Sequence, residues 1–197
     1  MEVAPGIYHV YARGNDRRRL FLDDDDRRWY LWKLGAVTVH RRWRTMSYCL
    51  MSNHLHALIE TIEPNLGRGM QALQGGYAQR FNKRHGTTGH VFERRFGWVP
   101  ITTEEQLMAT ASYIAHNPVA AGLIETASAW RWGSHAAMAG AAELPSWLAA
   151  DRLLSIYAEL GGDPFEAYMR HVTGRAEPAA TTTTALADDA PLSAEAA

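Results

Sequence analysis

The sequence predicts an α+β fold: a ferredoxin-like antiparallel sheet with helices on one face, followed by C-terminal helices. Segments with strand and helix patterns follow one another in the order strand, helix, strand, strand, helix, strand. Only two residues separate the two middle strand segments, which is typical of an antiparallel hairpin. This order is that of ferredoxin-like domains, in which helices cover an antiparallel sheet.

The first half of the pattern lies within residues 6–51. Residues 6–13 alternate and are rich in strand-forming residues, so they predict the first strand. A helix is predicted to begin near Asp23, because a run of aspartates suits the positive end of a helix dipole and Trp29 and Trp32 begin an apolar stripe at helical spacing. Residues 44–51 are the second predicted strand.

The second half begins at residues 54–60, a strand joined to the previous one through residues 52–53. A helix follows and ends at Gly86, with apolar side chains spaced mostly four apart. Residues 95–101 form the fourth predicted strand, where Pro100 favours an edge position. A further helix opens at residues 103–105. We expect it to end before residues 117–118, since a residue that precedes proline disfavours helix.

Beyond the sheet, residues 147–160 and 164–172 predict two short amphipathic helices. From residue 174 onward the chain is rich in Thr, Ala, Pro and acidic residues, and offers almost nothing to bury. We therefore divide the chain into a main domain (1–145), a helical appendage (146–173) and a disordered tail (174–197).

Composition excludes several classes of protein. The 197 residues are 47% hydrophobic, enough for a sizeable core, yet no stretch approaches the roughly 18 consecutive apolar residues of a membrane span. Cys49 is the only cysteine, so an internal disulfide and a cysteine-rich zinc site are both excluded. The composition suits a reducing cytoplasm and predicts no membrane partner.

Charge is unevenly distributed along the chain. The net charge is -1, but residues 1–145 carry 17 basic and 13 acidic side chains, whereas residues 146–197 carry 3 and 8. Residues 68–95 contain six basic side chains and a single acidic one. A local basic patch of this kind favours phosphate binding, although a solvated helix face is the ordinary explanation of a charge run.

The sharpest chemical feature is His54-Leu55-His56 in the third predicted strand. Alternate strand residues share a face, so both imidazoles leave the sheet together while Leu55 faces the core. Two ring nitrogens can then converge on one cation, with further positions left for another ligand, water or a phosphate oxygen. Surface or core histidines also produce this pattern, so the spacing alone does not establish a metal site.

A second feature is Tyr77, in the middle of the helix after the hairpin and next to residues 75–76, both glycine. Glycine inside a helix costs on the order of 1 kcal/mol relative to alanine, so helix propensity does not explain the pair. A phenol is a weak nucleophile near pH 7, because its usual pKa is about 10. It can attack where a metal polarises the target phosphate. A buried core tyrosine is the alternative interpretation.

Several different short motifs are spread along residues 6–136. They are residues 8–16, 20–26, 48–56, 65–70, 77–85, 89–96, 113–123 (YIAHNPVAAGL) and 130–132. In these motifs the sequence resembles the HUH-type single-tyrosine transposases of insertion sequences, and among them the REP-associated tyrosine transposases.

The resemblance implies that residues 1–145 are a catalytic domain that cuts and rejoins single-stranded DNA next to a hairpin formed by a palindromic repeat. It implies that His54 and His56 bind Mg²⁺ or Mn²⁺, and that Tyr77 is the nucleophile. The implied product is a 5′-phosphotyrosine link with a free 3′-hydroxyl, which can reverse the step on another DNA end without ATP. It further implies a monomer or homodimer in the bacterial cytoplasm, associated with the nucleoid.

The sequence departs from the family pattern at several positions. Ser52 stands where relatives usually have proline, and residues 133–135 (GSH) replace a common Ser-Ser-Tyr. Relatives often supply a third metal ligand one turn after the nucleophile, where this chain has Phe81. For DNA contacts we expect five basic residues, Arg80, Lys83, Arg84, Arg94 and Arg95, and salt bridges are the alternative explanation for Arg94 and Arg95.

Two other functions are compatible with the sequence. A ferredoxin-like sheet with basic and aromatic side chains can bind single strands without cutting them. A metal-dependent phosphodiesterase would cleave DNA with activated water and form no covalent intermediate.

Overall fold

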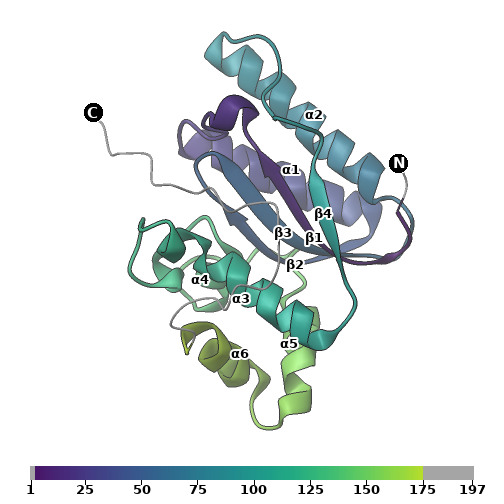
Figure 1. The fold of residues 1–197 in the computed structure, drawn as a ribbon, viewed down its shortest axis with the longest axis vertical. Helices are drawn as coiled ribbons and strands as arrows, with labels where there is room; N and C mark the ends of the chain where they lie inside the picture. The colour runs from purple at the N-terminus through teal and green to yellow at the C-terminus, as the bar shows by residue number, and fades with distance from the viewer. Residues whose placement is uncertain (1–2, 175–197) are drawn as a thin grey trace.

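The computed structural model describes residues 3–174 and is built on a four-stranded sheet (Figure 1). Its strands are β1 (Gly6–Arg13), β2 (Trp43–Leu50), β3 (His54–Thr61) and β4 (Gly97–Ile101). They lie in the order β2-β3-β1-β4, and each neighbouring pair is antiparallel. This order confirms the predicted ferredoxin-like fold.

Helices cover both sides of this sheet. Figure 1 shows α1 and α2 on one side, and α3 with the C-terminal helices on the other. In the described residues the α-helices are α1 (Asp24–Arg41), α2 (Leu66–His85), α3 (Glu104–Ala120), α4 (Ser134–Met138), α5 (Ala150–Tyr157) and α6 (Pro164–Thr173). Short 3₁₀ turns occur at Asn15–Arg17, Ala127–Ala129 and Ala158–Leu160.

The alternation of side chains along β3 separates two hydrophobic cores. Leu55, Ala57 and Ile59 belong to the core beneath α1 and α2. Leu58 belongs to the other core, which contains side chains of α3, α5 and α6. Because successive strand residues face opposite sides, His54 and His56 share the side of Leu58. The two histidines therefore lie on the side of the sheet that α3 covers.

Helix α1 begins where the aspartate run predicts. The Asp23 carboxylate accepts a hydrogen bond from the backbone N–H of Asp26 at 3.1 Å, which caps the first turn. Tyr30 and Leu34 are buried against the sheet. Trp32 is 62% exposed, so the apolar stripe expected from the sequence is only partly a core face.

Several predicted boundaries shift by one or two residues, as at β2 and at β4, where the strand begins at Gly97 rather than at 95. Strand β4 is an edge strand, as Pro100 predicts. The expected end of α3 before residues 117–118 is wrong, because the helix continues to Ala120. Pro118 lies in its last turn and removes only the single backbone bond that its own N–H would make.

The predicted C-terminal helices are present as α5 and α6. They pack on the sheet side that carries Leu58, and the backbone N–H of Ala149 donates to the Thr45 carbonyl at 2.9 Å. The division at residue 145 stays a prediction, and the predicted disordered tail lies outside the described residues apart from Gly174. None of the helices within residues 3–174 combines the length and apolar character needed to cross a membrane.

Candidate active site

Two histidine rings of β3 lie side by side beneath α3. The ring centroids of His54 and His56 are 5.2 Å apart, and the side chains are 7% and 1% exposed. Strand alternation sends both away from the core that contains Leu55. The structure thus brings the predicted pair together, on the side of the sheet opposite α1 and α2.

A third histidine reaches the pair from β1. Tyr11 is the direct cross-strand partner of His56, and His9 lies diagonally from it on the same face. The Nε2 atom of His9 is 2.9 Å from Nδ1 of His56, and the two rings are stacked with centroids 5.1 Å apart. Burial lowers the pKa of His9 to about 4.

Helix α3 contributes a tyrosine and an asparagine. Tyr113 and Asn117 are four residues apart and therefore share one face of the helix. The Tyr113 ring lies edge-on to His56, with centroids 5.4 Å apart, and 5.8 Å from His9. Asn117 Oδ1 is 3.4 Å from Nε2 of His54. The phenol of Tyr113 and the amide of Asn117 thus face the histidine pair from two successive turns of α3.

The environment holds His56 in its neutral form. Burial lowers the pKa of His56 well below its usual value, and the nearby His9, His54 and Arg13 lower it further. Neutral imidazole is the form that binds metals, because the cation has no lone pair to donate.

The partners of His54 define a place for a cation. Asn117 Nδ2 donates to the Tyr113 carbonyl at 3.1 Å, so Oδ1 is the amide atom that faces His54. The Nδ1 atom of the same ring lies 2.8 Å from Asn53 Oδ1, which is also an acceptor. A neutral imidazole has one proton, and the shorter contact takes it. The Nε2 lone pair then points toward the Asn117 oxygen, an arrangement that a cation between them stabilises.

These donors fit an open divalent-metal site. Across residues 3–174, no cluster of three or more His, Cys, Asp or Glu side chains could hold a metal. The geometry instead offers one nitrogen from each of His54 and His56, and the amide oxygen of Asn117. Three neutral donors leave positions for water or a phosphate oxygen, as Lewis-acid chemistry on a phosphodiester requires.

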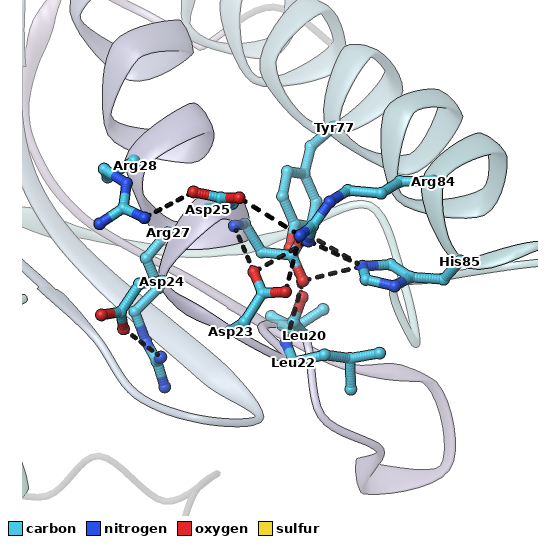
Figure 2. Close-up of polar contacts among 11 residues, drawn as sticks. Leu20, Leu22, Asp23, Asp24, Asp25, Arg27, Arg28, Tyr77, Arg84 and His85 are labelled. Atoms are coloured by element: carbon cyan, nitrogen blue, oxygen red, sulfur yellow. Dashed lines mark hydrogen bonds and ion pairs between the residues drawn. The ribbon is translucent and has the colours of Figure 1, made fainter.

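Tyr77 lies on the other side of the sheet. It is fully buried in the core that contains Leu55, and its hydroxyl donates to the Leu20 carbonyl (Figure 2). Burial raises the pKa of Tyr77 far above its usual value. The prediction that Tyr77 shares one site with His54 and His56 is therefore wrong, because the apolar stripe of α2 packs on the strand residues that alternate with the histidines.

Arg84 is engaged by the first turn of α1 rather than left open for phosphate. Its guanidinium lies 2.7 Å from the carboxylates of Asp23 and Asp26, and 3.4 Å from Asp25 (Figure 2). Hydrogen bonding to Arg84 lowers the pKa of Asp23 to about 2. Arg84 therefore has carboxylate partners within the chain, and its predicted role in DNA binding stays a prediction.

The other predicted DNA-binding residues fall into two groups. Arg80 and Lys83 lie on α2, away from the histidine side of the sheet, and the Arg80 guanidinium stacks over Trp29 at 5.5 Å. Arg94 and Arg95 are exposed in the segment before β4. That segment runs beside the end of β1, where the Glu93 N–H donates to the Arg13 carbonyl at 3.0 Å.

Arg13 is the cross-strand partner of His54. The structure therefore brings only Arg94 and Arg95, of the five predicted basic residues, to the end of the sheet that carries the site.

The sequence interpretation missed His9, Tyr113 and Asn117. Signals for all three were present. His9 precedes Tyr11 in an alternating strand, and Tyr113 with Asn117 has the i, i+4 spacing of one helix face. The expected helix end before residue 117 obscured the second signal, because it left Asn117 outside the helix.

Comparisons with known proteins agree with this fold. The family model described as "Transposase IS200 like" matches residues 3–117, more than half of the chain and all of the histidine, tyrosine and asparagine positions above. No curated protein matches the chain.

The solved structures that match the chain include the following two. A REP-associated tyrosine transposase bound to a REP hairpin has a TM-score of 0.61 at 15% identity, and the match covers 71% of this chain and 82% of that one. A candidate transposase from Deinococcus radiodurans R1 has a TM-score of 0.42 at 15% identity, with 53% and 85% covered. The first likeness shows the shared fold, and the family match covers the site: the chain belongs to the IS200-like transposase family.

Proposed function

We propose that this transposase-family chain cleaves and rejoins single-stranded DNA through a covalent tyrosine intermediate, with Tyr113 as the nucleophile. His54, His56 and Asn117 are the proposed ligands of the divalent metal. The observation that carries the proposal is the placement of Tyr113 and Asn117 on one face of α3, directly against the histidine pair. The third ligand one turn after the nucleophile, which Phe81 could not supply, is then Asn117.

The proposed reaction is a phosphoryl transfer that conserves the bond energy. The Tyr113 oxygen attacks the phosphorus and passes its phenol proton to water, a P–O bond to tyrosine forms and the P–O3′ bond breaks. The DNA 5′ end is then held on Tyr113, and the leaving oxygen becomes a 3′-hydroxyl after it takes a proton. Attack by a 3′-hydroxyl on this link reverses the step, so joining needs no ATP. His54, His56 and Asn117 would hold Mg²⁺ or Mn²⁺, which would supply polarisation of the phosphate and offset the charge that develops on it.

The protein groups around Tyr113 have defined tasks in this scheme. His54, His56 and Asn117 fix the position of the phosphate relative to the phenol oxygen, which matters because a misplacement of about 1 Å can cost on the order of 10²-fold in rate. Arg94 and Arg95 lie at the same end of the sheet and are proposed to contact the DNA backbone.

The proposed substrate is a single strand next to a hairpin. Its support is the fold shared with a REP-associated tyrosine transposase whose structure contains a REP hairpin. Action as a monomer or homodimer in the bacterial cytoplasm, close to the nucleoid, completes the proposal.

A labelled single-stranded hairpin oligonucleotide incubated with Mn²⁺ tests this function on a denaturing gel. We expect a protein–DNA adduct that EDTA and His56→Ala abolish. Binding without cleavage across a panel of hairpins would favour the noncatalytic module instead. Cleavage without any adduct would favour a phosphodiesterase that uses activated water.

A further inference from the structure

The two site histidines each have their Nδ1 atom held by a residue outside the proposed ligand set. For His54 the partner is Asn53 Oδ1 at 2.8 Å, and for His56 it is His9 Nε2 at 2.9 Å. In both rings the nitrogen that remains for the site is therefore Nε2. Each ring thus has a partner at Nδ1: Asn53 of the β2–β3 turn for His54, and His9 of β1 for His56.

The orientation of the Asn53 amide is fixed by its other bonds. Its Nδ2 donates to the Arg17 carbonyl at 3.3 Å, which leaves Oδ1 as the atom that faces His54. Its backbone carbonyl accepts from the N–H of Gly14 at 2.8 Å. An amide oxygen can only accept, so the proton in the contact with His54 belongs to the ring.

The turn that holds Asn53 is tightly packed. A Cβ atom at Gly14 would lie 2.1 Å from the Arg18 carbonyl oxygen, so only glycine fits where the chain leaves β1. The backbone N–H of Leu20 also donates to the Ser52 carbonyl at 2.8 Å. The segment after β1 therefore fixes the β2–β3 turn, and through it the acceptor beside His54.

The partner of His56 is fixed by the sheet itself. His9 is 5% exposed, and β1 places it diagonally across from His56. Their stacked rings bring one nitrogen of each within hydrogen-bonding distance, and one proton lies between them. When His56 Nε2 carries the lone pair directed at the site, Nδ1 is the donor and His9 Nε2 is the acceptor.

We propose that Asn53 and His9 are positioning residues that hold His54 and His56 in the tautomer protonated on Nδ1, with both Nε2 atoms presented to the metal. The inference rests on the proposed function for the identity of the ligands. Acceptors behind metal-binding histidines fix ring orientation and tautomer, and their loss typically costs 10–100-fold in metal affinity. Neither residue contacts the substrate in this role.

The tautomers can be read directly by ¹⁵N NMR of the metal-free full-length protein at pH 8. In the wild type we expect His54 and His56 as Nδ1–H forms. In Asn53→Leu we expect His54 to become the Nε2–H form, because Nε2 faces the acceptor Asn117 Oδ1 at 3.4 Å. In His9→Leu we expect His56 alone to change. An Nε2–H form of either ring in the wild type, or unchanged tautomers in the variants, would overturn the proposal.

Metal affinity is the second readout, measured by Mn²⁺ titration with electron paramagnetic resonance. We expect a 10–100-fold loss in Asn53→Leu and in His9→Leu, and near wild-type affinity in Asn53→Asp and His9→Gln, which restore an acceptor. His135→Leu is the matched control, since His135 is a buried histidine whose partner, Tyr168, lies outside the site.

An equal loss in the leucine and the acceptor-restoring variants would contradict the positioning role. The proposed function has its own point of failure: a wild-type protein that binds no Mn²⁺ refutes the metal site, whereas the tautomer measurement judges the positioning residues separately.

Discussion

Asn117 Oδ1 lies 3.4 Å from Nε2 of His54, while the Nδ2 of the same amide donates to the Tyr113 carbonyl one turn earlier in α3. One side chain thereby faces the histidine pair and is tied to the backbone of the proposed nucleophile. This relationship links the metal-binding side of the site to the helix that carries Tyr113.

Removal of the Asn117 oxygen is predicted to weaken metal binding. Asn117→Ala deletes one of three protein donors, so we expect at least a tenfold loss of Mn²⁺ affinity in a calorimetric titration. Asn117→Asp keeps an oxygen and adds a negative charge, so its affinity should equal or exceed that of the wild type. Equal affinities for the wild type and the alanine variant would show that Asn117 is not a ligand.

Substitution of Arg84 and substitution of Lys83 are predicted to have different effects on the melting temperature. Arg84→Met leaves the buried Asp26 carboxylate with fewer partners, so the melting temperature should fall while hairpin affinity changes less than twofold. The exposed Lys83 serves as the matched control, and Lys83→Met should leave the melting temperature nearly unchanged. A large loss of hairpin affinity in a stably folded Arg84→Met protein would show that Arg84 contacts the DNA.

Two glycines of α2 are predicted to respond in opposite ways to alanine. A Cβ atom at Gly75 meets nothing within 4 Å, so Gly75→Ala should raise the free energy of unfolding by about 0.5–1 kcal/mol through helix propensity. A Cβ atom at Gly69 would lie 2.0 Å from the Trp43 ring, and overpacking there should cost about 1–3 kcal/mol. Urea unfolding measures both, and a destabilised Gly75→Ala would show that the glycine has another role.

Stability is predicted to fall as the pH drops from about 6.5 toward 4. Burial, and secondarily the nearby His116, lowers the pKa of His135 to about 4. The unfolded chain therefore binds a proton that the folded chain excludes, so this contribution is complete above pH 6.5 and is lost on acidification. A pKa difference of this size corresponds to roughly 3 kcal/mol.

Urea unfolding of the wild type and His135→Leu at pH 7.5 and pH 5 checks this expectation. We expect a smaller pH effect in the variant, although His9 retains a similar contribution in both proteins. An identical pH dependence would remove His135 as a cause.

The sequence pattern was sufficient for the sheet and for its two central histidines. Alternation over residues 6–13 and 54–60 identifies two strands and a two-residue connection identifies the β2–β3 hairpin, and these signals are local. The helix end before residue 117 is predicted incorrectly because the residue before a proline is only biased against helix, whereas Asn117 and Pro118 are both buried in α3, which continues to Ala120.

The choice of tyrosine required a comparison between elements. Tyr77 belongs to the apolar stripe of α2, which packs against Leu55 and its neighbours on the side of the sheet opposite the histidines. Because His54 and Leu55 face opposite sides of β3, a helix that packs on Leu55 does not bring its tyrosine to the histidine pair. The identity of the helix that covers the opposite side depends on the path of residues 102–120 after β4, which no local pattern specifies.

The most direct test compares Tyr113→Phe with Tyr77→Phe in the covalent-adduct assay with a labelled single-stranded hairpin and Mn²⁺. We predict that Tyr113→Phe forms no adduct yet binds the hairpin and metal as the wild type does. Tyr77→Phe should form the adduct while it loses about 1–2 kcal/mol of stability, because the Leu20 carbonyl loses its donor. An adduct that persists in Tyr113→Phe and disappears in a folded Tyr77→Phe protein would contradict the assignment of the active site.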